Sequence, residues 1–200
     1  MFNISFPEEE FDLFIDVGLS HNAPHTRETL SINPKAFVIG IEPNPESCQS
    51  IRRLNLGDRF HLIEGGASDI LETIILNMMS PDPGASSFLS VTNILLDQGY
   101  SIINKVEVPC FRLESILDEV PWQRVNGGSF SMKSDTQGYE VKVLLGLGPY
   151  LDKIKDLQIE STTWGQYENA ATLDDIKMII DPHLEFIKED KENAWFKKKS

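Results

Sequence analysis

Three carboxylates follow three expected strands, and a glycine or proline stands beside each. Asp16 precedes Gly18 in "FIDVG", Glu42 precedes Pro43 in "VIGIEP", and Glu64 precedes two glycines in "LIEGG". The carboxyl ends of parallel strands share one edge of a sheet, and ligands of open α/β sheets bind at that edge. These residues could therefore face one cleft.

The second carboxylate has the position of a ribose-binding residue. Glu42 lies 42 − 16 = 26 residues after Asp16, close to the offset of about 20 residues in nucleotide folds. A carboxylate there accepts hydrogen bonds from the vicinal hydroxyls of adenosine; the alternative is a surface carboxylate. After the third strand, Asp69 could accept a proton from an adenine amino group, with Ala67 or Ser68 supplying backbone contacts. A helix N-cap is the alternative role for Asp69.

The first loop argues against a dinucleotide. Gly18 stands without the second and third glycines of a G-x-G-x-x-G turn, so the loop has no cradle for a pyrophosphate. A nicotinamide-binding oxidoreductase is therefore a weaker hypothesis. S-adenosylmethionine fits better, because carboxylates attract its sulfonium and would repel a pyrophosphate.

Short apolar runs alternate with helical patterns along the chain, which predicts an α/β fold with a largely parallel sheet. The expected strands are 11–17, 36–42, 59–68, 72–79, 105–113, 128–135, 156–161, 184–190 and 194–198. The expected helices are 25–33, 45–56, 113–120, 139–151 and 172–181.

Six stretches, in this order, resemble the FkbM family of S-adenosylmethionine-dependent methyltransferases: "FIDVGLSHNAPHT", "VIGIEPNPES", "LIEGGASD", "GASSF", "VPCFRLESIL" and "SMKSDTQGYEVKVLLGL". The last holds the most specific motif, K-x-D-x-[EQ]-G-x-E. The resemblance implies a Rossmann-like methyltransferase fold: a mostly parallel sheet of about seven strands, helices on both faces and an antiparallel last strand. It also implies methylation of a hydroxyl on a sugar, a glycan or a secondary metabolite.

The resemblance also assigns residues to the cofactor. It places Asp16 and Gly18 in the cofactor turn, Glu42 on the ribose, and Asp135 at the reacting end, and it gives the adenine to Ala67, Ser68 and Asp69. The first loop departs from the family pattern, since Asn22 or Ala23 occupies the place of a second glycine. Asparagine tolerates left-handed backbone angles, so Asn22 can serve in the turn.

Methyl transfer to a hydroxyl gains about 10²–10⁴-fold from a base that takes the proton. Asp135 is the first candidate, and His21 and His25 in the first loop are the next. Asp135 and Glu160 both end strands, so together they could also hold Mg²⁺. In the alternative, Glu160 is a structural hydrogen-bond acceptor and the histidines are plain surface residues.

Four residues are candidates for the acceptor site. Ser86 and Ser87 lie in the loop of an inserted segment, 72–112, which in the family resembles a flap over the active site. Trp164 and Tyr167 could line an acceptor pocket, because aromatic faces suit sugar rings; packing at the rim of the core is the alternative.

Composition limits the partners. The 200 residues suit one domain, 1–200, with a core of about 11–198. The net charge is −13 and the basic cluster is the terminal "FKKKS", so neither nucleic acid nor an anionic membrane is an expected partner. The two cysteines, no signal-like start and no long apolar run predict a cytoplasmic chain with reduced thiols. A homo-oligomer and a catalytically silent binding or assembly module stay open.

Overall fold

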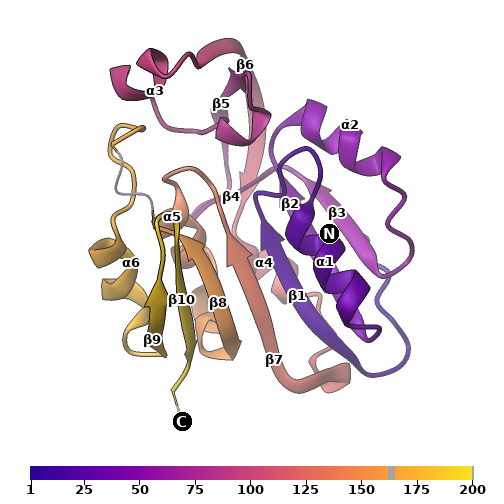
Figure 1. The fold of residues 1–200 in the computed structure, drawn as a ribbon. Coiled ribbons are helices and arrows are strands. Elements are labelled where there is room, and N and C mark those ends of the chain that lie inside the picture. Colours follow the sequence, from indigo (N-terminus) through magenta and orange to yellow (C-terminus); the bar gives the residue numbers. More distant parts are fainter. Residues whose placement is uncertain (162–164, 200) are drawn as a thin grey trace.

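The computed structural model describes residues 1–161 and 165–199. Its main sheet has seven strands in the order β3-β2-β1-β7-β8-β10-β9 (Figure 1). Their bounds are β1 Phe11–Val17, β2 Ala36–Glu42, β3 Phe60–Glu64, β7 Val125–Ser134, β8 Ile154–Glu160, β9 Leu184–Glu189 and β10 Asn193–Lys198. β1, β2, β3, β7 and β8 pair in parallel, whereas β10 is antiparallel to both neighbours. The predicted fold class, with its antiparallel last strand, is confirmed.

The helices connect the strands and cover the sheet. They are α1 Pro24–Ile32, α2 Pro45–Arg53, α3 Asn93–Asp97, α4 Leu113–Leu117, α5 Glu140–Leu145 and α6 Leu173–Ile180. In Figure 1, α1 lies in front of the main sheet and α4 lies behind it. Because both faces are covered, every residue of β2 is buried. In the part of the chain that the structure describes, no helix is long and apolar enough to cross a bilayer.

Local sequence explains why α2 begins where it does. The Asn44 side chain accepts hydrogen bonds from the backbone N–H groups of Glu46 and Ser47, and Pro45 occupies the first helical position. Arg52 and Arg53 lie in the last turn, where the helix dipole favours positive charge. The turn that follows Glu42 is therefore held rigidly against the start of α2.

A second sheet stands beyond the edge of the first, in the order β4-β6-β5. Its strands are β4 Gly66–Ala67, β5 Glu72–Ser80 and β6 Ser101–Phe111, with α3 between β5 and β6. As expected for 59–68, the third strand leads into a Gly-Gly turn: β3 ends at Glu64, and the chain leaves the main sheet at Gly65. A Cβ on Gly65 would lie 2.7 Å from the Pro109 carbonyl oxygen, so only glycine allows the two sheets to meet there.

The segment 139–151 was expected to be helical at first and to stop near its Gly-Pro pair, and the structure agrees. α5 ends at Leu145, and a 3₁₀ helix, Gly148–Lys153, follows it. Gly148 has a φ of 54°, which interrupts the helix. Both cysteines are buried and free, in agreement with the expected reduced thiols.

The sheet order creates a switch point. The chain runs outward from β1 to β2 and β3, and then returns at β7 on the other side of β1. In open α/β sheets a crevice opens at such a point, outside the carboxyl ends of the strands. The ends of β1 and β7 therefore define the place where a ligand is expected.

Candidate functional site

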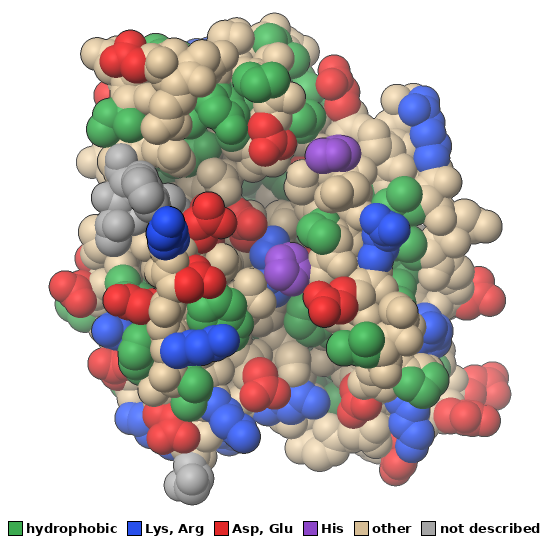
Figure 2. Space-filling model, in the orientation of Figure 1, with side chains coloured by type: hydrophobic (Ala, Val, Ile, Leu, Met, Phe, Trp, Pro, Cys, Tyr) green, Lys and Arg blue, Asp and Glu red, His purple; other side chains and the backbone are tan. Residues whose placement is uncertain are grey.

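A cavity of about 510 Å³ opens at the carboxyl ends of β1, β2, β7 and β8, and the second sheet overhangs it. Figure 2 shows this hollow between the upper part of the molecule, formed by α3, β5 and β6, and the main body. Its volume lies within the range of about 300–1,000 Å³ that is usual for small-molecule sites. Gly18, Glu42, Ala67, Ser86, Ser87, Asp135 and Glu160, all predicted as site residues, line it.

Gly18 lies so close to the Asp135 backbone that no side chain fits between them. A Cβ at this position would lie 1.8 Å from the backbone oxygen of Asp135, and the φ of Gly18 is +78°. The Asp135 N–H donates to the Val17 carbonyl oxygen at 2.9 Å, which extends the β1–β7 pairing into the site. A side chain would push these two strand ends apart, so glycine is required here.

Glu42 is a buried carboxylate whose position is fixed by the backbone around it. Its side chain accepts hydrogen bonds from the N–H groups of Ser20 and Asn44, each at 2.9 Å. Burial raises its pKa to about 7, against the effect of these hydrogen bonds. Each oxygen of an ionised carboxylate has a further lone pair, so Glu42 can still accept two hydroxyl groups from the cavity.

Next to Glu42, the wall of the cavity is apolar. Gly66 and Ala67 supply backbone without bulky side chains, and Leu76, Phe88 and Tyr139 complete this side. The rings of Phe88 and Tyr139 meet edge to face, with centroids 5.3 Å apart. A flat heterocycle such as adenine suits this part of the cavity.

Two of the residues assigned to the adenine do not line the cavity. The hydroxyl of Ser68 is turned away and donates to Glu72 at 2.9 Å. The carboxylate of Asp69 pairs with the Lys142 ammonium at 2.8 Å. Strand β5, not a helix, follows this segment, so Asp69 is not an N-cap either. Backbone pairing between β4 and β6 explains the difference, because it sets which side chains turn inward.

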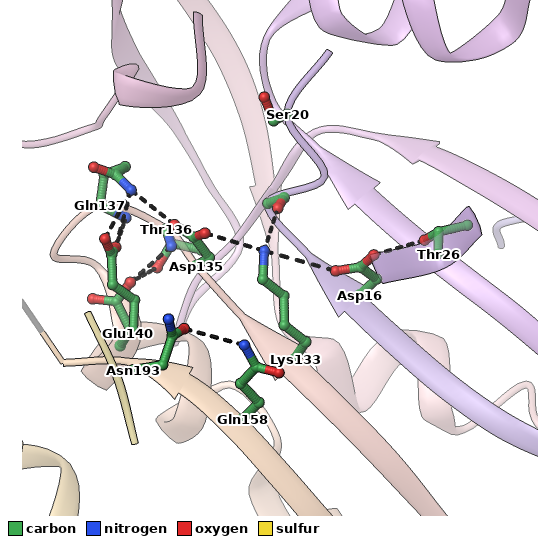
Figure 3. Close-up of polar contacts among 12 residues, drawn as sticks. Asp16, Ser20, Thr26, Lys133, Asp135, Thr136, Gln137, Glu140, Gln158 and Asn193 are labelled. Atoms are coloured by element: carbon green, nitrogen blue, oxygen red, sulfur yellow. Dashed lines mark hydrogen bonds and ion pairs between the residues drawn. The ribbon is translucent and has the colours of Figure 1, made fainter. Parts of the chain in front are cut away.

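Lys133 lies at the centre of the switch point (Figure 3). Its ammonium donates to the Gly18 carbonyl oxygen at 2.9 Å and lies 3.2 Å from Asp135 and 4.0 Å from Asp16. Burial alone would lower the pKa of Lys133, but the charges of Asp135 and Asp16 raise it above its ordinary value. Lys133 is therefore charged, and it ties the end of β1 to the end of β7.

Asp16 is positioned behind this lysine and does not line the cavity. It is 1% exposed, and it accepts a hydrogen bond of 2.6 Å from the Thr26 hydroxyl. Burial raises the pKa of Asp16, although Lys133 and Thr26 favour its charged form. Its placement fits a role in holding Lys133 better than the predicted direct contact with a cofactor.

Asp135 and Glu160, at the ends of β7 and β8, both face the cavity. Burial would raise the pKa of Asp135, but Lys133 and Gln137 hold it below the ordinary range. Asp135 is thus an ionised carboxylate at neutral pH, available to accept a proton. The Gln137 amide nitrogen lies between it and Glu160, at 2.8 Å from Asp135 and 3.0 Å from Glu160.

The magnesium prediction gains no support from this geometry. The described residues include no group of three or more His, Cys, Asp or Glu that could hold a metal ion. Gln137 and Lys133 already contact the two carboxylates that were expected to bind it. A metal would have to displace the amide.

The structure places neither histidine in the cavity. His21 is exposed, hydrogen-bonds to Ser20 and lines a separate surface hollow with Glu46 and Asp82. His25 lies in α1 and does not line the cavity. Neither histidine is therefore well placed to act as the base that takes the proton of the acceptor hydroxyl.

In the first loop, the residues with left-handed backbone angles are not the residue that was expected to have them. Ser20 and Ala23 adopt positive φ values of 56° and 43°, whereas Asn22 does not. Ala23 is fully buried, and Asn22 is exposed and lines no part of the cavity. The cofactor role expected of Asn22 is therefore not supported, and Ser20 occupies that part of the cavity instead.

Three of the four acceptor candidates lie around the overhanging loop. The Ser86 hydroxyl donates to Pro83 and so stays within the loop, and the Ser87 hydroxyl donates to the Gln137 carbonyl oxygen at 2.9 Å. Tyr167 is buried behind the cavity wall, and its hydroxyl lies 2.9 Å from the Gln137 side-chain oxygen. Trp164 lies outside the described residues.

Sequence reasoning missed many lining residues, among them Ser20, Phe88, Gln137 and Tyr139. Gln137 lies inside the K-x-D-x-[EQ]-G-x-E motif, so its place in that motif was an available signal. Tyr139 immediately precedes α5, where an aromatic ring reads as helix packing. Nothing in the sequence marks Ser20, since its contact is made by the backbone.

Solved structures with the same fold include S-adenosylmethionine-dependent proteins. Fibrillarin from Aeropyrum pernix, with natively bound S-adenosylmethionine, superposes with a TM-score of 0.50 at 12% identity, covering 96% of this chain and 68% of that chain. Precorrin-6y C5,15-methyltransferase from Geobacter metallireducens gives a TM-score of 0.43 at 12% identity, covering 96% and 82%. A mutant of MtNAS in complex with S-adenosylmethionine gives 0.47 at 10% identity, and this chain spans 56% of its length while 95% of this chain is covered.

At 12% identity, the likeness to fibrillarin shows the fold alone. No curated protein matches the chain. The sequence itself matches the model of the methyltransferase FkbM domain over residues 16–190, which includes the ends of β1, β2, β7 and β8 and the whole second sheet. The chain therefore belongs to the FkbM methyltransferase family, whose methyl donor is S-adenosylmethionine.

Proposed function

We propose that this protein transfers a methyl group from S-adenosylmethionine to a hydroxyl of a small molecule, such as a sugar, a glycan or a secondary metabolite. The observation that carries the proposal is that two carboxylates line opposite sides of one cavity. Glu42 lies on one side, beside the apolar wall, and Asp135 lies on the other, at the switch point. Glu42 suits the hydroxyl groups of a ribose, and Asp135 suits the hydroxyl group that is to be methylated.

The residues present fit the cofactor. Glu42 would accept hydrogen bonds from the two ribose hydroxyls, and Phe88 and Tyr139 would enclose the adenine with Ala67. Gly18 lines the cavity where β1 and β7 end side by side, and the amino-acid end of the molecule would lie there. When bound, S-adenosylmethionine supplies an electrophilic methyl group on a positively charged sulfur.

The chain itself supplies position and a proton acceptor. Asp135 is ionised and is held by Lys133 and Gln137, so it can orient an acceptor hydroxyl and take its proton as the oxygen becomes a nucleophile. A carboxylate suits an O–H donor, which supports a hydroxyl as the methylated group. The overhanging loop around Ser86 and Ser87 covers the cavity and limits access of water.

The first experiment is calorimetric titration with S-adenosylhomocysteine. We expect micromolar binding by the wild-type protein and binding at least about 100-fold weaker by Glu42→Ala, because two hydrogen bonds to a charged group are lost. Glu46→Ala is the matched control, since Glu46 lies in α2 and does not line this cavity. Equal binding by wild type and Glu42→Ala would contradict the ribose role.

A catalytically silent binding module is the second candidate, and the altered first loop favours it. Asp135→Asn separates the two functions. If the chain is an enzyme, this variant keeps its affinity for S-adenosylhomocysteine and loses methyl transfer to hydroxylated acceptors, followed with radiolabelled methyl donor. Binding without transfer by the wild type, across glycans and hydroxylated metabolites, would favour the silent module.

A further inference from the structure

The Gln137 side chain occupies the space between the carboxylates that end β7 and β8. Its amide nitrogen lies 2.8 Å from an oxygen of Asp135, and 3.0 and 3.1 Å from the two oxygens of Glu160. Figure 3 shows the amide of Gln137 beside Asp135, with a dashed line for their hydrogen bond. An amide nitrogen has two hydrogens, so it can donate one to each carboxylate.

Several contacts fix this amide in one orientation. The hydroxyl of Tyr167 lies 2.9 Å from the Gln137 side-chain oxygen, which leaves the nitrogen to face the acids. The backbone N–H of Gln137 donates to Glu160 at 3.2 Å, and its carbonyl oxygen accepts from the Ser87 hydroxyl. Gln137 also has a φ of 55°, an uncommon value for a residue other than glycine. The surrounding structure holds the residue in this conformation.

Two carboxylates this close to one nitrogen repel each other unless something positive stands between them. Proteins often solve this with a divalent cation, which takes oxygen ligands from two acidic side chains. Here the amide hydrogens stand in that place, and Lys133 pairs with Asp135 from the opposite side at 3.2 Å. The amide therefore contacts the same two carboxylates that a bridging cation would contact.

We propose that Gln137 is a positioning residue that substitutes for a divalent cation, clamping Asp135 and Glu160 toward the cavity so that the site needs no metal. The clamp also joins the overhanging loop, through Ser87, to the acidic pair. Replacing the amide by a carboxylate removes the two donated hydrogens and adds a third acidic ligand. That single change is expected to turn a metal-independent site into a cation site.

The test is titration of the full-length protein with MgCl₂ and MnCl₂, read by calorimetry and by the rise in Tm. Wild type is expected to show no saturable binding, whereas Gln137→Glu is expected to bind at least about tenfold more tightly, because added carboxylate ligands raise cation affinity. Gln166→Glu is the control, since it adds the same charge to a residue lining the same cavity. It should behave like wild type.

Two further variants keep the outcome decisive. Gln137→Met removes the amide without adding charge, so it should gain weak cation binding even if Gln137→Glu folds poorly. Asp135→Asn in the Gln137→Glu background should abolish the gained binding. Saturable binding by wild type that Asp135→Asn removes, or equal behaviour of Gln137→Glu and Gln166→Glu, would overturn the proposal.

Turnover gives a second readout, and this part of the inference rests on the proposed function. Gln137→Glu should lose methyl transfer in chelator and regain part of it with Mg²⁺, while its affinity for S-adenosylhomocysteine changes little. Wild-type transfer should be insensitive to chelator. A failure of the methyltransferase proposal would leave cation titration unaffected, so the two failures are distinguishable.

Discussion

Gly18 and Gly57 allow a direct test of how closely β1 and β7 must approach. The two glycines have almost the same φ, +78° and +79°, but their surroundings differ. A Cβ on Gly18 would lie 1.8 Å from the Asp135 backbone oxygen, whereas a Cβ on Gly57 meets nothing within 4 Å. Alanine at either position therefore carries the same backbone strain, and only Gly18→Ala adds a collision.

The magnitudes follow from these two terms. A left-handed conformation costs an alanine about 1–2 kcal/mol, and this is the whole expected effect at Gly57. At Gly18 the forced separation of the strand ends adds about 1–3 kcal/mol of overpacking. For a chain of this size each kcal/mol lowers Tm by about 2–4 °C, so Gly57→Ala should lower Tm by about 2–8 °C and Gly18→Ala by about 4–20 °C.

Thermal and urea unfolding followed by circular dichroism measure the difference, and calorimetry with S-adenosylhomocysteine measures its consequence for the site. Gly18→Ala should also lose binding, because the Lys133 ammonium donates to the Gly18 carbonyl oxygen and would move with it. Gly57→Ala should bind normally. Equal stability losses in the two variants, or normal binding by Gly18→Ala, would refute the idea that the close approach builds the site.

Two further predictions concern buried charge. Lys133→Met leaves Asp16 and Asp135 without their shared cation, and we expect a loss of about 3–5 kcal/mol in urea unfolding, which a stable variant would contradict. Burial gives Glu42 a folded pKa of about 7, above its ordinary value of 4.5, so the folded state binds more protons than the unfolded state between these values. The free energy of unfolding should therefore fall as pH rises from 5 to 8, with on the order of 3 kcal/mol coming from Glu42. Glu42→Gln should flatten this dependence of stability on pH. An unchanged dependence would show that Glu42 is not protonated in the folded state.

Strands β1 and β2 were predictable because their sequences are bounded on both sides. β1 and β2 were expected at 11–17 and 36–42, and the structure has them there. Each is rich in apolar residues and ends at a carboxylate or a glycine turn, so local pattern and burial agree. The cavity position of Glu42 follows from the same reasoning, because a strand end fixes where its side chain lies.

The other features of the site depend on contacts between distant parts of the chain, and this limited what could be predicted from the sequence. The Lys133 ammonium pairs with Asp135, two residues away, and with Asp16 of the distant strand β1. β7 lies beside β1 although more than 100 residues separate them, and no local pattern states which strands become neighbours. Glu140 instead accepts hydrogen bonds from Thr136, four residues earlier, as its place in the first turn of α5 suggested.

The same long-range contact explains how one motif can serve both fold and chemistry. Lys133 lies near the end of β7 and Asp135 directly follows that end, so both side chains reach the switch point from the same segment. The Lys133 ammonium contacts Asp16 and Gly18 at the end of β1, and its charge lowers the pKa of Asp135, which faces the cavity. Any change that separates β1 from β7 must therefore alter the charge state of Asp135 as well as its position, because the lysine that keeps it ionised is anchored on the other strand. The stability of the β1–β7 pairing and the reactivity of the Asp135 carboxylate therefore depend on the same contacts.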